Sequence, residues 1–232
     1  MVAGQIIYFA SDFHLGAPDE ESSREREKNI VAWLRSIEGD AETVFLMGDV
    51  FDFWFEYKTA VPRGHVRLLG QLAQMADNGI RLVFFTGNHD MWAFDYLEKE
   101  IGMEIHRKPL LTELKGKRFY LAHGDGIGPG DHKYKFLKAV FANPLCQWLF
   151  ARLHPNFGIG IAQYFSRKSR LSTEDETFYG DKEWQVIHSR DMLKEHGKID
   201  FFIYGHRHLA NDIPLKETAR FINLGDWIYY LS

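Results

Sequence analysis

The sequence predicts an α/β domain in which helices flank a buried β-sheet. Five short apolar runs are each followed at once by a cluster of polar residues, and helical patterns separate the runs. Continuous apolar runs of this length are typical of strands that are buried on both faces. The chain has 232 residues, of which 45% are hydrophobic and 26% are charged, and a chain of this size can bury its core without disulfides. We therefore expect a single domain that spans residues 1–232.

The predicted strands follow one another with their polar clusters in a fixed order. QIIYFA (5–10) leads into SDFHLG, ETVFLM (42–47) into GDVFDFW, IRLVFFT (80–86) into GNHD, RFYLA (118–122) into HGDG, and DFFIY (200–204) into GHRH. Near the end of the chain, RFINLGDWIYYLS (220–232) predicts two more strands around Gly225 and Asp226.

Helices are predicted between these strands. One helical repeat consists of Ile30, Trp33, Leu34 and Ile37, and a second of Val66, Leu69, Leu72 and Ala73. The second helix can end at Asn78 and Gly79, and a third is expected over 182–195. Residues 128–180 interrupt the alternation of strands and helices. They are helical in pattern, rich in aromatic residues and contain several arginine and lysine residues. We expect them to be an insertion that forms a helical cap over the core.

Composition and the N-terminus exclude several classes of protein. The net charge of −4 argues against nucleic acid as a partner. The first residues do not form a signal peptide, and no window is apolar enough for a membrane span. The single cysteine, Cys146, excludes an internal disulfide, and its apolar neighbours predict a buried, inert thiol. We expect a cytoplasmic protein, with contact at a membrane surface left open.

The polar clusters carry side chains that can bind metal ions. The first cluster offers Asp12 and His14, and the fifth offers His206 and His208. Each pair is two residues apart, a spacing that places both side chains on one face of a strand. The clusters between them add Asp49, Asn88, His89 and His123. Because ligands gather outside the carboxyl ends of strands in α/β sheets, we expect these groups to meet.

Carboxylate, imidazole and amide groups without a thiolate suit Mn²⁺, Fe or Zn²⁺. These groups exceed the needs of one ion, but two ions bridged by a carboxylate would use them. Such a pair can polarise a phosphoryl oxygen and turn a bridging water into hydroxide. Each cluster alone has a structural interpretation, as a helix cap, a turn or a hydrogen-bonded core histidine. Five clusters in this order are very unlikely to arise by chance.

The blocks DFHLG, GDVFDFW, GNHD, HGDG and GHRH resemble, in order and spacing, the signature of the calcineurin-like metallophosphoesterases. The resemblance spans Asp12 to His208, and it implies an α/β fold (α+β in some schemes) made of a two-sheet sandwich flanked by helices. It implies two divalent metal ions, with Asp49 as their bridge. The ligands would be Asp12, His14 and His208 for one ion, and Asn88, His123 and His206 for the other. His89 and Asn88 would be catalytic, with His89 meeting the phosphoryl group or the leaving oxygen.

Within the superfamily the chain is most similar to the UDP-2,3-diacylglucosamine hydrolases of lipid A synthesis. The similarity rests on GDVFDFW, the length, the aromatic and basic cap, and the terminal NLGDW. It implies hydrolysis of an acylated UDP-sugar to UMP and 2,3-diacylglucosamine 1-phosphate, with Mn²⁺ as the leading metal. The residues expected to bind substrate are His89, Asp131, Ser166, Lys168 and Arg170. The best-known branch has arginine where this chain has His89, which keeps another nucleotide or sugar phosphate open as the substrate.

The segment 133–155 contains more apolar residues than one side of a helix needs. It could form a slot for acyl chains, a helical hairpin packed on the sheet, or a dimer contact. The acyl slot would favour peripheral contact with the cytoplasmic face of the inner membrane. A metal-bearing scaffold that performs no chemistry is the alternative from another functional class, and the sequence leaves the oligomeric state open.

Overall fold

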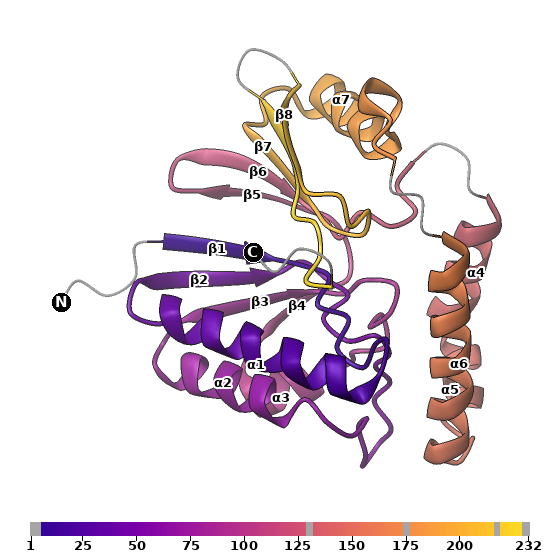
Figure 1. Ribbon diagram of the computed structural model, residues 1–232. Helices are drawn as coiled ribbons and strands as arrows, with labels where there is room; N and C mark the ends of the chain where they lie inside the picture. Colours follow the sequence, from indigo (N-terminus) through magenta and orange to yellow (C-terminus); the bar gives the residue numbers. More distant parts are fainter. Residues whose placement is uncertain (1–5, 129–131, 174–176, 216–218, 229–232) are drawn as a thin grey trace.

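The computed structural model of the chain is a sandwich of two β-sheets with helices on its outer faces (Figure 1). It describes residues 6–128, 132–173, 177–215 and 219–228. The first sheet is parallel and has the order β1-β2-β3-β4. Its strands are β1 (Ile6–Ala10), β2 (Ala41–Leu46), β3 (Arg81–Phe85) and β4 (Glu104–His106). The two-sheet architecture that the sequence predicts is confirmed.

The second sheet is mixed and has the order β5-β6-β7-β9-β8. Its strands are β5 (Leu110–Leu114), β6 (Lys117–Leu121), β7 (Phe201–Tyr204), β8 (Asn211–Pro214) and β9 (Arg220–Asn223). The central strand β7 pairs in parallel with both β6 and β9, whereas β5 and β8 pair antiparallel with their neighbours. The carboxyl ends of β6 and β7 therefore lie at the same edge.

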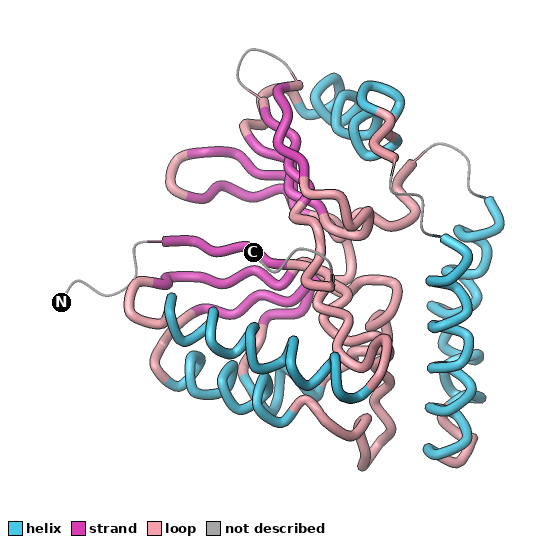
Figure 2. The backbone as a smooth tube through the Cα atoms, viewed as in Figure 1, coloured by secondary structure: helices cyan, strands magenta, loops and turns pink. Residues whose placement is uncertain are grey.

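Helices cover the outer faces of both sheets (Figures 1 and 2). The first sheet carries α1 (Glu20–Ile37), α2 (Val66–Asp77) and α3 (Tyr96–Ile101), and the second carries the 3-10 turn η1 (Gly180–Lys182) and α7 (Trp184–His196). Asp19 caps α1 by accepting a hydrogen bond from the backbone N–H of Ser22 at 2.8 Å. Helix α1 buries Ile30, Leu34 and Ile37 against the sheet, as their spacing predicts.

The space between the sheets is filled by large apolar side chains. Phe45, Val83 and Phe85 of the first sheet meet Leu121 and Ile203 of the second in one buried cluster. Each such side chain contributes roughly 1.5–3 kcal/mol when it is fully buried. This layer holds the two sheets together and fixes the position of the loops at their carboxyl ends.

Three further helices stand together at one end of the sandwich, within the segment for which the sequence predicts a cap (Figure 1). They are α4 (His132–Ala142), α5 (Pro144–Phe150) and α6 (Pro155–Thr173). They contact the domain through an aromatic cluster in which Phe150 packs against Phe53, Phe55 and Trp92. The indole N–H of Trp92 also donates to the carbonyl of Phe141 at 2.8 Å.

The structure corrects several details of the predicted elements. Strands β4, β5 and β8 and helix α3 were not predicted, because they are short and lack a long apolar run. The second of the two strands predicted near the end is not present over residues 224–228, and 229–232 lie outside the described residues. Cys146 is half-buried rather than buried, because α5 lies at the periphery beside the exposed Leu145 and Trp148. In the described parts of the chain, no helix has the length and apolar character needed to cross a membrane.

Candidate metal centre

The loops that follow β1, β2, β3, β6 and β7 meet at one end of the sandwich and bring the predicted ligands together. Three groups of side chains there have nitrogen or oxygen atoms that all lie within 4.8 Å of one another. The groups are Asp12 with His14 and His208, Asp49 with His123 and His206, and His14 with Asp49 and His89.

The backbone reason for this convergence differs from the one that the sequence suggests. The paired residues lie beyond the ends of β1 and β7, so the strand period of two does not orient them. Instead, the residues in left-handed backbone conformations include five potential ligands: Asp12 (φ 55°), His14 (φ 44°), Asp49 (φ 52°), His206 (φ 69°) and His208 (φ 55°). Such conformations are unfavourable for residues with a Cβ atom, and they persist only where surrounding contacts hold them.

Two glycines make room for the clustered side chains. A Cβ atom on Gly205 would collide with Ser11 Oγ and Asp12 Oδ2, and one on Gly87 would collide with Asp49 Oδ1. The backbone N–H of His206, directly after Gly205, donates to Asp12 Oδ1 at 3.1 Å. The glycines in GHRH and GNHD thus permit close backbone approach to the carboxylates.

The first group forms around the fully buried Asp12. Its Oδ1 lies 3.3 Å from Nε2 of His208 and 3.6 Å from Nε2 of His14. The two Nε2 atoms are 2.9 Å apart. Burial raises the pKa of Asp12, but hydrogen bonds from His14 and His208 outweigh it and hold the pKa well below its usual range. The group therefore presents a carboxylate anion to any cation among these atoms.

The second group forms around Asp49, whose Oδ2 lies 3.2 Å from Nε2 of His123 and 3.8 Å from Nε2 of His14. Asp49 therefore lies between the two groups. Burial lowers the pKa of His123, but the charge of Asp49 outweighs it and raises the pKa to about 10. Burial and the charge of His123 lower the pKa of His206 to about 4. The buried Oδ1 of Asn88 has no hydrogen-bond partner among the described residues, which leaves it available to a cation.

Oxygen atoms also fix the orientation of two histidine rings through their Nδ1 atoms. Nδ1 of His208 lies 3.2 Å from Oδ2 of Asp226, and Nδ1 of His123 lies 2.8 Å from the carbonyl of Met47. In both rings Nε2 faces the shared centre. Metal-binding histidines almost always use their second nitrogen in this way, which fixes the tautomer and the ring orientation. Together with the nitrogen and oxygen donor set, this arrangement fits a pair of divalent cations.

His89 lies beside this centre, with its ring centroid 4.9 Å from that of His14. Its backbone N–H donates to Asp49 Oδ1 at 2.9 Å. Its Nδ1 lies 2.9 Å from the carbonyl oxygen of Asp52. Because that oxygen can only accept, Nδ1 carries the proton and Nε2 keeps its lone pair in the neutral ring. Burial lowers the pKa of His89, which favours this neutral form.

The family model described as Calcineurin-like phosphoesterase matches residues 6–210. The chain belongs to this family. It is 40% identical over 97% of its length to the UDP-2,3-diacylglucosamine hydrolase of Porphyromonas gingivalis and covers 92% of that protein. Enzymes of the same name from Edwardsiella ictaluri and Tolumonas auensis are 28% and 26% identical, over 86% and 97% of this chain and over 74% and 91% of their own. The chain is therefore a metallophosphoesterase that uses divalent metal ions, rather than a non-catalytic scaffold.

Helix α6 of the phosphoesterase reaches the metal centre through Ser166. Its hydroxyl lies 3.2 Å from the carbonyl of Asp52, 3.1 Å from Oδ2 of the same residue and 3.0 Å from Nδ1 of His89. Of the residues expected to bind substrate, His89 and Ser166 thus lie together. Asp131 and the side chains of Lys168 and Arg170 lie outside the described residues.

Four buried carboxylates of the phosphoesterase site were not singled out from the sequence. Asp90 accepts hydrogen bonds from the backbone N–H groups of Val50 and Gly87 at 2.8 and 2.7 Å. It therefore connects the loop after β2 to the loop after β3. Burial and the charge of Asp49 raise its pKa to about 7. Asp52, Asp125 and Asp226 are the other three. Asp52, Asp90 and Asp125 stand inside the signature blocks and Asp226 inside the terminal NLGDW, and that position is the signal that could have found them.

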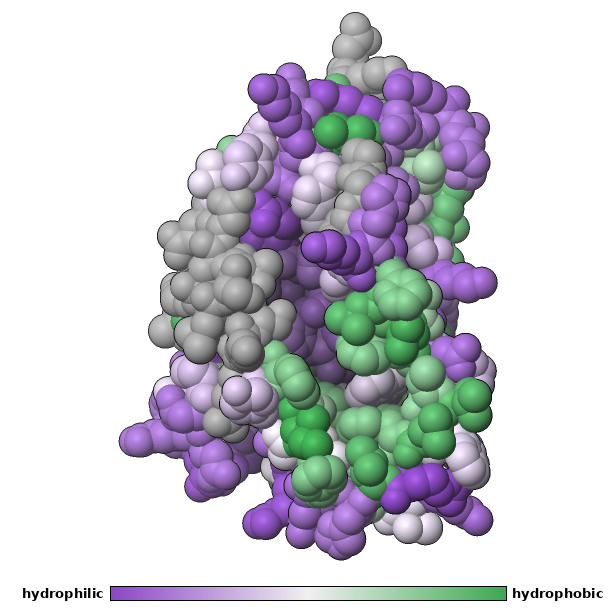
Figure 3. Space-filling model, turned by 90° about the vertical axis from the view of Figure 1, so that its right-hand side faces the viewer, coloured by the Kyte–Doolittle hydropathy of each residue, from purple (hydrophilic) through white to green (hydrophobic). Residues whose placement is uncertain are grey.

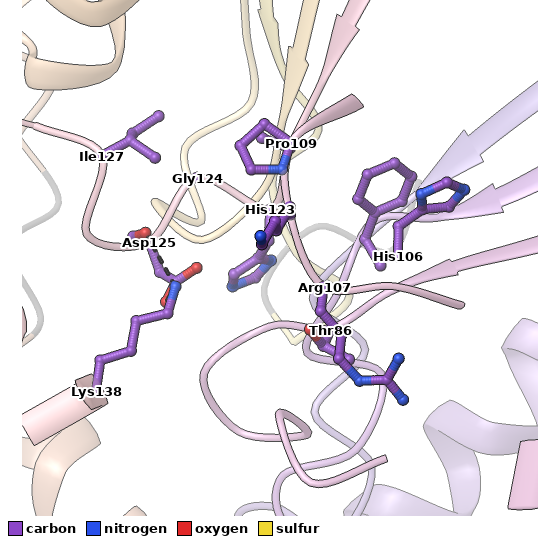
Figure 4. A pocket seen from close by; sticks show the side chains of 12 residues that line it. Thr86, His106, Arg107, Pro109, His123, Gly124, Asp125, Ile127 and Lys138 are labelled. Carbon is purple, nitrogen blue, oxygen red and sulfur yellow. Dashed lines mark hydrogen bonds and ion pairs between the residues drawn. The ribbon is translucent and has the colours of Figure 1, made fainter. Parts of the chain in front are cut away.

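A pocket lies beside His123 (Figure 4). It is bordered by Thr86 after β3, by Asp125 after β6 and by Lys138 of α4. Lys138 Nζ lies 2.6 Å from Asp125 Oδ2, and the hydroxyl of Tyr134 donates to the same oxygen at 2.6 Å. Helix α4 is therefore anchored at the metal centre by a charged contact, as α6 is by Ser166.

Proposed function

We propose that this phosphoesterase hydrolyses the pyrophosphate bond of UDP-2,3-diacylglucosamine, releasing UMP and 2,3-diacylglucosamine 1-phosphate. The observation that carries the proposal is the direct contact between the metal centre and the apolar helices α4–α6, made through Ser166. A phosphoryl-transfer centre beside a large apolar surface suits a substrate that joins a pyrophosphate to acyl chains. The names of the relatives support this substrate.

The proposed metal assignment follows the two groups of side chains. Asp12, His14 and His208 would hold one ion, Asn88, His123 and His206 would hold the other, and Asp49 would be shared by both. Mn²⁺ is the leading candidate, with Fe and Zn²⁺ as alternatives for the same nitrogen and oxygen donors. When bound, such a pair polarises a phosphoryl oxygen and lowers the pKa of a bound water.

The protein's own part in the reaction centres on His89 and Asn88. The carbonyl of Asp52 fixes the proton of His89 on Nδ1, so Nε2 is left to face the reacting phosphoryl group and can take up a proton from solvent. Once protonated, the ring can stabilise charge on the leaving oxygen or donate the proton to it. In its protonated form the ring would do part of what a permanently charged arginine does in the best-known branch.

Helices α4–α6 are proposed to form a cap that receives the acyl chains. Packing on the aromatic cluster buries only part of the apolar surface of these helices. A helical hairpin packed on the sheet would therefore not explain the apolar side chains that stay exposed. Large apolar side chains on and between these helices stay exposed: Phe136, Leu137, Phe141, Leu145, Trp148, Leu149, Leu153, Phe157, Tyr164 and Phe165. Figure 3 shows this end of the molecule, where apolar surface borders a hydrophilic hollow. Each acyl CH₂ buried there would contribute about 0.8 kcal/mol.

The same apolar surface supports peripheral contact with the inner membrane, from which an acylated substrate would be taken. In this proposal Ser166 binds the substrate together with Asp131, Lys168 and Arg170, and the protein works at the cytoplasmic face. Nucleic acid is not a proposed partner, since the net charge is −4.

The test is a side-by-side assay of UDP-2,3-diacylglucosamine, unacylated UDP-N-acetylglucosamine and a simple aryl phosphodiester. We expect kcat/KM to be highest for the acylated substrate, and to rise with acyl length until the cap is filled. Equal efficiency on all three would overturn the proposed substrate and leave a metallophosphoesterase for another nucleotide or sugar phosphate.

A further inference from the structure

The loop from Asp12 to Ala17 carries two proposed ligands of one metal ion in an unfavourable backbone conformation. Asp12 and His14 have φ angles of 55° and 44°. The loop after β2 supports them from one side. The backbone N–H of Asp12 donates to the carbonyl of Gly48 at 3.0 Å, and that of His14 donates to the carbonyl of Asp49 at 2.9 Å. The carbonyls of Asp12 and Leu15 accept from the backbone N–H groups of Trp227 and Asp52, at 3.2 and 2.9 Å. The carbonyls of Phe13, His14 and Ala17 face α1, and of these His14 also accepts from Ala17 within the loop at 3.2 Å.

Arg26 of α1 satisfies these carbonyls from the other side. It is buried, with 6% of its surface exposed. Its Nε donates to the carbonyl of Phe13 at 2.7 Å and its Nη2 to that of His14 at 2.8 Å. Nη2 also donates to the carbonyl of Ala17. A planar guanidinium offers several donors in a fixed fork, so one side chain can hold three carbonyls of a curved loop at once.

The same face of α1 fixes the loop at a further point. Ser23, three residues before Arg26, accepts a hydrogen bond from the N–H of Gly16 at 2.7 Å. Phe13 and Leu15 are fully buried beside these contacts. A carbonyl that lost its partner in such surroundings would not regain one easily, and an unsatisfied buried group costs roughly 1–3 kcal/mol. Loss of Arg26 should therefore change the shape of the loop rather than leave it in place.

We propose that Arg26 is a positioning residue of the metal centre. It holds the loop in the left-handed conformation that turns Asp12 and His14 toward one ion, and it acts on that ion rather than on the fold as a whole. The proposal rests on the assignment of Asp12, His14 and His208 to a single ion. In the sequence Arg26 stands in the charged run SREREK, where it is indistinguishable from a solvent-exposed residue.

The chain offers a matched control on the same helix. Arg24 is two residues away, has the same side chain and is exposed. Metal-free protein is prepared from wild type, Arg26→Met, Arg26→Lys and Arg24→Met, and Mn²⁺ binding is measured by titration together with the melting temperature in chelator. We expect Arg26→Met to weaken one of two binding steps by about 10–100-fold and to leave the other within about threefold. Arg26→Lys should fall between, because one ammonium group reaches fewer carbonyls.

Activity at saturating Mn²⁺ adds a second readout, since a positioning role predicts that excess metal restores most of the turnover of Arg26→Met. Arg24→Met should match wild type throughout. A lower melting temperature with two wild-type binding steps would overturn the proposal and make Arg26 purely structural. If Arg26→Met does not fold, Arg26→Lys decides by the same criterion. Wild-type protein that binds two ions but does not cleave the acylated UDP-sugar would contradict the proposed function alone.

Discussion

His208 is held between two carboxylates, with Nδ1 3.2 Å from Asp226 Oδ2 and Nε2 3.3 Å from Asp12 Oδ1. Asp226 belongs to the terminal segment NLGDW, so the end of the chain orients a residue of the metal centre. Burial lowers the pKa of His208, but Asp12 and Asp226 outweigh it and raise the pKa to about 10.

Asp226→Asn should therefore weaken metal binding without removing a proposed ligand. We expect a loss of about 10–100-fold in the affinity for one ion, because the ring loses the carboxylate that fixes its orientation. Titration of the metal-free variant with Mn²⁺ measures this loss, and Asp212→Asn on the exposed part of β8 is the control. Wild-type affinity in Asp226→Asn would contradict an orienting role.

Asp49→Ala should abolish nearly all activity, because Asp49 is the proposed bridge between the ions. The loss should exceed the roughly 100-fold that removal of an orienting partner costs, while circular dichroism shows the fold largely kept. Elemental analysis of the purified variant measures the number of bound metal ions per chain. Two tightly bound ions per chain would be incompatible with the bridging assignment.

His89→Ala should separate turnover from metal binding. Since His89 is proposed to act on the phosphoryl group, the variant should keep its metal content and lose on the order of 10²–10⁴-fold in kcat. His196→Ala, at the exposed end of α7, should behave as wild type. The role is wrong if His89→Ala loses metal but turns over normally once metal is resupplied.

The sequence predicted the core strands well, because each central strand is a short apolar run that stops where the polar loop begins. The histidines and aspartates that it named as potential ligands lie close together in the structure. The sequence could not predict why the ligands converge. The left-handed backbone at Asp12 is held by contacts with Gly48 and Trp227, and that at His206 by a contact with Asp12. These partners are far apart in the sequence, so no local pattern records them. The burial of Arg26 could not be predicted either, because it depends on the packing of α1 against the loop after β1. Asp90 and Asp226 resemble ordinary turn residues until the fold buries them.

Metal binding should release protons. Without metal the pKa values of His123 and His208 are both about 10, so both rings are protonated at pH 7.5. A ring must be neutral to bind a metal ion, so loading both ions should release about two protons per chain at this pH. The apparent affinity should accordingly rise with pH up to about 10. Calorimetric titrations in two buffers of different ionisation enthalpy measure the number of protons released. A binding heat that does not depend on the buffer would contradict proton release.

The central claim is tested most directly by the products formed from UDP-2,3-diacylglucosamine. Purified protein is incubated with this substrate, with and without a chelator, and the products are quantified by mass spectrometry. The account predicts UMP and 2,3-diacylglucosamine 1-phosphate in equal amounts, no product after chelation, and recovery when Mn²⁺ is added back. Intact substrate in the metal-loaded reaction, or product formation that the chelator does not affect, would contradict it.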